Sequence, residues 1–150
     1  MARADFACVH RLRVRWAEVD MQKVVFNGHY LTYVDCAVAE YWRAIGLAYP
    51  EGYLSKFGQD FFLRKATVEY LEAAHYEEEL AVCCRVGRLG RSSMIFLFEI
   101  YRDAPGPAPS PLVTAELVYV NAEPRGMTPA PLPEELRERI LRYERVAPQA

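Results

Sequence analysis

Two hydrophobic patterns follow one another in the first third of the chain. In Arg11–Trp16 apolar residues alternate with arginines, a period of two that predicts a strand with one buried face. From Tyr30 the spacing of apolar residues changes to three and four, which predicts a long helix that Gly46 ends. The helical stripe is unusually aromatic and consists of Tyr30, Tyr33, Val34, Ala37, Val38, Tyr41, Trp42 and Ile45.

Strand-like runs fill most of the remaining chain. Turn signals, including a proline-rich loop at Asp103–Pro111, separate four such runs at about 61–71, 79–89, 92–102 and 112–121. Pro133–Leu141 follows as a short helix, with proline at its start and acidic residues in its first turn. The predicted order is one strand, the long helix, four strands and a C-terminal helix, an α+β chain.

Two of these runs are apolar on both faces. Met94–Phe98 and Leu117–Val120 lack the alternation of a half-exposed strand, which is typical of central strands covered on each side. One long helix covers only one face of a sheet. We therefore expect a second copy of the chain to cover apolar surface, as a homodimer or homotetramer.

Composition narrows the class of protein. The chain has 150 residues, 52% of them hydrophobic, which fits one globular domain over residues 1–150. Its 18 basic and 20 acidic residues give a net charge of −2, so no overall positive field is available for nucleic acid, and an anionic ligand would have to be small. No stretch approaches the roughly 20 apolar residues of a membrane span.

The cysteine and histidine patterns give no sign of a metal. Four cysteines have no CxxC spacing and are interpreted as reduced thiols, so we expect a cytoplasmic location. Nothing supplies three ligands at metal spacing, and no metal or cofactor is expected.

The loop between the first strand and the long helix carries the candidate chemistry. Asp20 lies in a largely apolar segment, Glu18–Tyr30, close to the helix start at Asn27 or Gly28. Backbone N–H groups at a helix start have no intrahelical partner and can receive a developing oxyanion, while a carboxylate can act as base or nucleophile. These parts suit acyl transfer to water. From the residues alone, Asp20 as a turn cap and Asn27 as a helix cap remain open alternatives.

Asp20–Tyr33 resembles the signature of hot-dog thioesterases of the 4-hydroxybenzoyl-CoA thioesterase-like type. It has the Asp, a Val-Val-aromatic run at Val24–Phe26, and a Tyr ten residues after the Asp. The similarity continues through Val68–Tyr70, Ala74–Leu80, the Gly90–Ser93 turn and Leu112–Ala115. Lys23 stands where the family usually has Gly, a residue that accepts positive φ at low cost.

The resemblance implies a fold and an activity. The fold is the hot-dog fold, an antiparallel five-stranded sheet wrapped around a long central helix, with a short C-terminal helix. The activity is hydrolysis of an acyl-CoA to a carboxylic acid and CoA. By position, Asp20 matches the catalytic carboxylate and the Asn27 N–H matches the group that polarises the thioester carbonyl, while Tyr30 is assigned to substrate binding.

The same resemblance places the CoA nucleotide on a basic surface at the subunit boundary. Arg88, Arg91, Ser92 and Ser93 combine cations, hydroxyls and a flexible turn, which suits phosphates. Lys65 is a further candidate contact, as is Arg125.

Several alternatives accompany this interpretation. His29 is a candidate catalytic group near the helix start, although a hydrogen bond that holds the loop is the simpler role. Glu40 is the second candidate carboxylate, because another branch of hot-dog thioesterases carries its carboxylate on the helix; a pair with Arg43 is the simpler role. The alternative functions are a non-catalytic acyl-CoA sensor, an acyl carrier protein thioesterase, and a dehydratase that uses His29 with Asp20.

Overall fold

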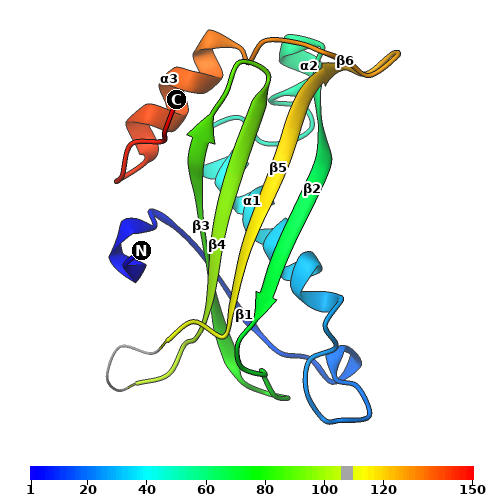
Figure 1. Cartoon of the computed structure of the whole chain (residues 1–150), viewed down its shortest axis with the longest axis vertical. Helices are drawn as coiled ribbons and strands as arrows, with labels where there is room; N and C mark the ends of the chain where they lie inside the picture. Colours follow the sequence, from blue (N-terminus) through cyan, green and yellow to red (C-terminus); the bar gives the residue numbers. More distant parts are fainter. Residues whose placement is uncertain (106–109) are drawn as a thin grey trace.

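A computed structural model describes residues 1–105 and 110–150. Its centre is an antiparallel sheet with the strand order β1-β3-β4-β5-β2 (Figure 1). The strands are β1 (Cys8–Arg13), β2 (Asp60–Tyr70), β3 (Glu79–Leu89), β4 (Ser93–Arg102) and β5 (Val113–Glu123). A two-residue strand, β6 (Thr128–Pro129), pairs with β5. Part of the predicted proline-rich loop, 106–109, lies outside the described residues.

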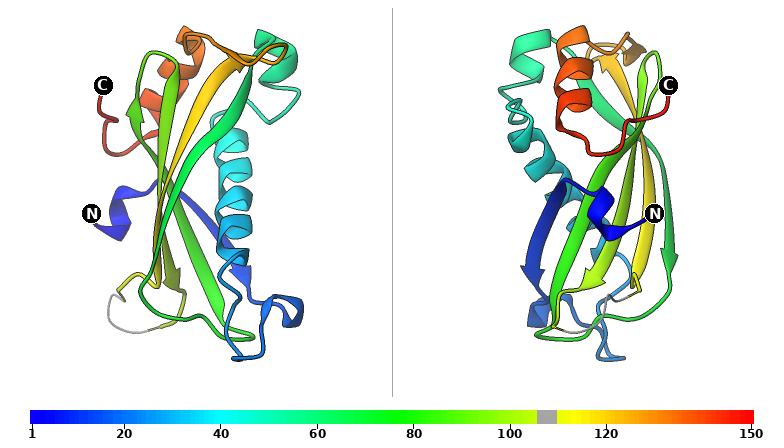
Figure 2. Two further views of the ribbon diagram at one scale, coloured as in Figure 1. Left: turned by 45° about the vertical axis from the view of Figure 1, so that its right-hand side comes forward. Right: turned by 90° about the vertical axis from the view of Figure 1, so that its left-hand side faces the viewer.

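The helix α1 (His29–Ala44) lies along one face of the curled sheet (Figure 2). All eight apolar residues of the predicted stripe are buried, so the helical pattern is confirmed. Gly46 has a φ of +79° and its N–H donates to the Arg43 carbonyl, so the predicted stop signal ends the helix. The apolar stripe thus fixes which side of α1 faces the sheet and where its start points.

Shorter elements close the two ends of this core. The predicted C-terminal helix is α3 (Glu134–Tyr143), which buries Leu136 and Ile140 completely. The short helix α2 (Leu54–Phe57), like β6, had no counterpart in the sequence pattern. Two 3-10 turns, η1 (Arg3–Asp5) and η2 (Trp16–Glu18), precede and follow β1, and the N-terminal turn lies on the sheet face away from α1 (Figure 2).

The predicted first strand, Arg11–Trp16, overlaps strand β1 only in its first half. Strand β1 ends at Arg13, and Trp16 lies in η2 with 75% of its surface exposed, although the alternation had assigned it to the buried face. The reason is a local side-chain contact: the Glu18 carboxylate accepts a hydrogen bond from the Arg15 N–H at 2.8 Å, which bends the chain into a turn. Periodicity alone does not detect such a contact.

The sheet has two ends with different neighbours (Figure 1). At one end β2 finishes beside the Asp20 loop, which we define as residues 19–28. At the other end lie α2, α3 and the β3–β4 turn, defined as residues 90–92. The candidate residues named from the sequence are divided between these two ends.

Candidate functional site

Asp20 opens a tight turn in the Asp20 loop. Its N–H donates to the Val24 carbonyl at 3.0 Å, and its carbonyl accepts from the Lys23 N–H at 2.9 Å. The carboxylate oxygen Oδ1 accepts from the Gln22 N–H at 2.8 Å. Asp20 therefore does cap a turn, but that contact uses only one carboxylate oxygen. The second oxygen, Oδ2, has no hydrogen-bond donor among the residues that the structure describes.

Lys23 adopts the conformation that the family's usual glycine would favour. Its φ is +65°, in the left-handed region that side chains with a Cβ enter at a cost of about 1 kcal/mol or more. The Asp20 turn therefore keeps the geometry that a glycine would permit, and the substitution is absorbed as local backbone strain.

A buried carboxylate fastens the loop to α1. Glu18, only 7% exposed, accepts hydrogen bonds from the Tyr33 hydroxyl at 2.8 Å and from the Arg15 N–H and guanidinium. Burial by itself would raise the pKa of Glu18, but these hydrogen bonds lower it below its usual range, so the carboxylate is ionised at neutral pH. The Glu18 carbonyl also accepts from the Phe26 N–H at 2.9 Å, which closes the base of the loop.

Asp20, Asn27 and Tyr30 line one open hollow of about 280 Å³. The structure thus brings together three of the residues named from the sequence. The other lining residues are Gln22, Val24, Val25, Tyr70, Leu71, Glu72 and Ala73. The apolar members partly shield the carboxylate from water, and the hollow is wide enough to admit a small acyl group at the end of an extended arm.

The start of α1 provides an unused donor at this hollow. Gly28 is the N-cap and no side chain caps the helix, so the alternative in which Asn27 serves as a helix cap is wrong. The His29 N–H donates to the Phe26 carbonyl at 2.9 Å, whereas the Asn27 N–H makes no hydrogen bond with any described residue. The Tyr70 hydroxyl donates to the Asn27 carbonyl at 3.3 Å and so orients that residue. A free N–H at a helix start favours negative charge.

His29 is not among the residues that line the hollow. Its ring packs edge-on against Phe26, with the ring centroids 5.7 Å apart. Its location gives no support to a role in proton transfer with Asp20.

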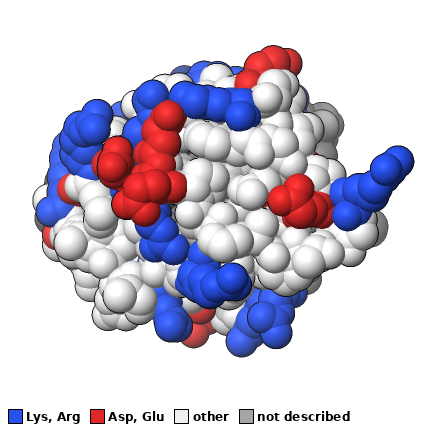
Figure 3. Space-filling model, turned by 90° about the horizontal axis from the view of Figure 1, so that it is seen from above, with Lys and Arg blue, Asp and Glu red and all other residues white. Residues whose placement is uncertain are grey.

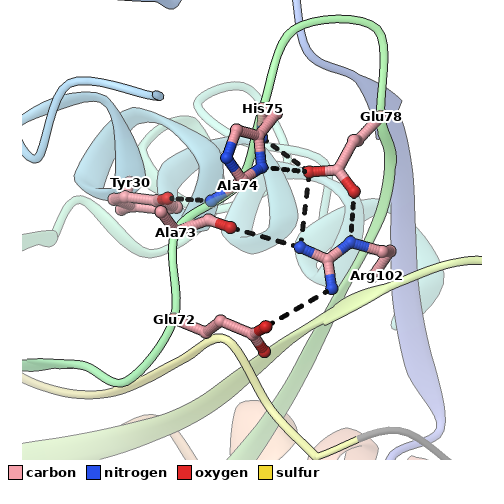
Figure 4. A network of polar contacts seen from close by, with 7 residues as sticks. All are labelled: Tyr30, Glu72, Ala73, Ala74, His75, Glu78 and Arg102. Carbon is pink, nitrogen blue, oxygen red and sulfur yellow. Dashed lines mark hydrogen bonds and ion pairs between the residues drawn. The ribbon is translucent and has the colours of Figure 1, made fainter. Parts of the chain in front are cut away.

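The segment 72–75, which we call the strap, forms one wall of the hollow and is held from three sides; Figure 4 draws the contacts with Tyr30 and Arg102. The Ala74 N–H donates to the Tyr30 hydroxyl at 3.2 Å, and its carbonyl accepts from the Val25 N–H at 2.9 Å. Arg102, at the end of β4, donates to the Ala73 carbonyl at 3.2 Å and pairs with Glu78. The strap therefore joins the Asp20 loop, α1 and the sheet into one unit.

The remaining predicted binding residues lie elsewhere. Arg88 is in β3, Ser93 begins β4, and Arg91 and Ser92 are in the β3–β4 turn at the far end of the sheet (Figure 1). Figure 3 looks down on that end and shows Lys and Arg side chains around its rim, interspersed with acidic groups. The 11 residues of β2 span about 35 Å, so the two groups of candidates are far apart within one chain.

Lys65 lies between these groups, exposed on β2 beside an irregularity in the pairing with β5. Glu40 forms the predicted pair with Arg43, at 2.6 Å.

A second hollow of about 310 Å³ lies further along α1, lined mainly by aromatic rings, with Asp35 among its lining residues. Its aromatic members are Trp42, Tyr49, Phe61, Phe96 and Tyr119.

Sequence reasoning missed three residues at the Asp20 hollow. Tyr70 and Glu72 reach it from the end of β2 and from the strap, and Glu18 supports it from beneath. Only Glu18 had a local signal, because an acidic residue three positions after Arg15 can accept from that N–H.

Within residues 1–105 and 110–150, no group of three or more His, Cys, Asp or Glu side chains could hold a metal ion. In the same residues no helix is long and apolar enough to cross a membrane.

One family model matches more than half of the chain. The model of the Thioesterase superfamily matches residues 22–108. A putative esterase from Aquifex aeolicus is 25% identical over 95 residues, which cover 63% of this chain and 73% of the relative.

Solved structures resemble the chain over nearly its whole length. A Thermus thermophilus thioesterase, crystallised with coenzyme A and zinc, is 28% identical, with a TM-score of 0.78 and coverage of 93% of this chain and 96% of the other. A Pseudomonas aeruginosa protein is 21% identical, with a TM-score of 0.81 and coverage of 97% and 96%. A 1,4-dihydroxy-2-naphthoyl-CoA thioesterase from Synechocystis is 19% identical, with a TM-score of 0.78 and coverage of 89% and 94%. The curled antiparallel sheet around α1 is the hot-dog fold that the sequence predicted.

Proposed function

Because the chain belongs to the thioesterase superfamily and is a thioester hydrolase, we propose that it hydrolyses an acyl-CoA with Asp20 as the catalytic carboxylate. One observation carries this proposal: Asp20 and the start of α1, with its free Asn27 N–H, border the same hollow. A carboxylate and an oxyanion donor on one cavity are the parts that hydrolysis of a thioester requires.

In this mechanism the thioester carbonyl oxygen accepts from the Asn27 N–H, and its carbon faces Asp20. Asp20 either removes a proton from water as that water attacks the carbonyl, or attacks first and forms a mixed anhydride that water then hydrolyses. In both routes the C–S bond breaks and CoA leaves as the thiolate. The partial positive charge at the start of α1 stabilises the oxyanion in each tetrahedral intermediate.

The CoA assignment rests on the family and on the basic turn. A related Thermus thermophilus structure contains coenzyme A, and Arg88, Arg91, Ser92 and Ser93 offer phosphate ligands. These groups are far from Asp20 in the same chain, so we propose that one protomer supplies Asp20 and its partner supplies the turn. Lys65, on β2 between the two ends, would face the boundary between them.

The edge of β2 supports a dimer of this kind. Strand β2 is the last strand of its side of the sheet and has no further strand beyond it among the described residues. Leu63, Tyr70 and Leu71 are each at least half exposed along or just after it. Antiparallel pairing of two such edges about a twofold axis would set the β3–β4 turn of one protomer near the Asp20 loop of the other. Light scattering should give a dimer or tetramer at micromolar concentration, and a stable monomer would contradict this.

Arg91→Ala should raise KM for an acyl-CoA about five- to thirtyfold and lower kcat less, with the effect shrinking as salt is added. The Arg91 carbonyl accepts from the Leu132 N–H at 2.9 Å, so truncation of the side chain leaves the turn held. Steady-state kinetics would measure both constants. An acyl-pantetheine ester, which lacks the nucleotide, should be hydrolysed equally by wild type and variant. An equal loss on that ester would mean that Arg91 acts on the fold or the acyl site.

Three other functions make different demands. A non-catalytic acyl-CoA sensor would bind the ligand without turnover, and an acyl carrier protein thioesterase would prefer the carrier-bound ester. A dehydratase would need His29 opposite Asp20, and His29 does not border the hollow. Release of free thiol from short, long and aromatic acyl-CoAs, compared with a carrier-bound ester, distinguishes the first two from the proposed function. No thiol release from any ester would overturn hydrolysis.

We propose that the protein acts in the cytoplasm. All four cysteines are free thiols, and three of them are buried in the core. Unpaired buried thiols are typical of reducing compartments.

A further inference from the structure

The hollow around Asp20 contains a second carboxylate. Glu72 belongs to the strap and lines the same hollow as Asp20. The other lining side chains are neutral, and no lysine or arginine is among them. A group that enters this hollow therefore meets two negative charges and no positive charge on its walls.

Glu72 is only weakly paired with the nearby Arg102. Arg102 Nη1 lies 3.9 Å from Glu72 Oε1, at the limit of an ion pair. The other nitrogens of Arg102 are engaged by Glu78 and by the Ala73 carbonyl (Figure 4). Arg102 thus pairs mainly with Glu78, and it neutralises the negative charge of Glu72 only in part.

The position of Glu72 is fixed by its neighbours in the chain. Arg102 holds the Ala73 carbonyl, and Tyr30 accepts from the Ala74 N–H, so the backbone beside Glu72 is fastened to the sheet and to α1. The Glu72 side chain is 62% exposed and stands at the open side of the hollow. The carboxylate therefore extends from a fastened backbone at the edge of the hollow, where its negative charge acts on a group that enters.

We propose that Glu72 is a specificity-determining residue that excludes acyl groups with a carboxylate close to the thioester, so that the substrates are neutral acyl groups. This inference rests on the proposed function, because a thioester carbonyl at Asp20 brings the first carbons of the acyl group into the hollow. A carboxylate on those carbons would meet both Asp20 and Glu72 at short range. A neutral group of the same shape meets no such repulsion.

Two CoA esters of nearly equal shape test this. Malonyl-CoA carries a carboxylate where isovaleryl-CoA carries two methyl groups, and their nucleotides are identical. The readout is the ratio of kcat/KM for isovaleryl-CoA to that for malonyl-CoA. Glu72→Gln should lower this ratio about two- to fivefold at low salt, and the difference should shrink at high salt.

Glu69→Gln is the matched control. It removes the same charge three residues away, from a side chain that lines a different hollow, on the opposite face of the sheet. The ratio of the two kcat/KM values in Glu69→Gln should equal that of wild type. If the ratio for Glu72→Gln equals that of wild type, or if the ratio falls equally in both variants, the inference is wrong. Hydrolysis of isovaleryl-CoA would still support the proposed function in that case. If wild type hydrolysed neither ester nor any other acyl-CoA, the proposed function and this inference would both be wrong.

Discussion

Asp20→Asn is expected to lower kcat by two or more orders of magnitude while the variant folds and binds CoA esters much as wild type does. The amide retains an oxygen that can accept from the Gln22 N–H, the contact that the carboxylate makes at 2.8 Å, so the turn is preserved. An amide cannot take a proton from water at neutral pH and is a poor nucleophile, so the chemical step is lost. Thiol release under saturating substrate measures kcat, and a thermal melt checks the fold.

Glu40→Gln provides the comparison for this result. Glu40 also carries a carboxylate on the α1 side of the molecule, but it is paired with Arg43 and does not line the Asp20 hollow. Its replacement should leave turnover within a small factor of wild type. If Glu40→Gln abolished hydrolysis and Asp20→Asn did not, the catalytic carboxylate would be on the helix.

Glu18→Ala should have the second large effect, a loss of about 2 to 4 kcal/mol in the free energy of unfolding. Truncation leaves the hydroxyl of the buried Tyr33 and the Arg15 N–H without their acceptor. Urea unfolding measures the loss, and hydrogen exchange should show that the Asp20 loop opens more readily. Glu116→Ala, which removes an exposed glutamate from β5, should change stability by less than about 0.5 kcal/mol.

The stability that Glu18 contributes should decrease as pH falls. The pKa of Glu18 is lowered in the folded protein, so the unfolded chain binds its proton first as pH falls. The stability that the ionised carboxylate contributes is full at neutral pH and is lost from about pH 4.5 downward, through the lowered folded pKa. The difference between wild type and Glu18→Ala should therefore narrow in acid. A constant difference from pH 7 to the acid limit would mean that the charge of Glu18 contributes nothing.

The parts of the fold that could be predicted are those with a regular period. The stripe from Tyr30 to Ile45 repeats for four turns, and each of its positions is buried as expected. The end of β1 could not be predicted from alternation, because it depends on a bond between Glu18 and the Arg15 N–H, whose only signal in the sequence is the three-residue spacing of the two residues. The short elements α2 and β6 have too few residues to show a period.

In the candidate site, too, only the residues that are close together in the sequence could be predicted. Asp20, Asn27 and Tyr30 are close in sequence, so one loop and one helix start were enough to bring them together. Glu72 and Tyr70 reach the hollow only because β2 runs antiparallel in the sheet and ends there. The basic turn at Arg91 could be identified by its composition, but its distance from Asp20 depends on the length and direction of β3 and β4.

The Asp20 loop and the turn that contains Arg91 lie at opposite ends of the sheet, and in the proposed dimer this separation has a genetic consequence. A protein with Asp20→Asn and a protein with Arg91→Ala are each defective at both of their sites. When the two are unfolded together and reassembled, each mixed pair combines the intact Asp20 of one chain with the intact Arg91 of the other. One of its two sites then holds both defects and the other holds none. Two alleles that are impaired alone would therefore complement each other in the same cell.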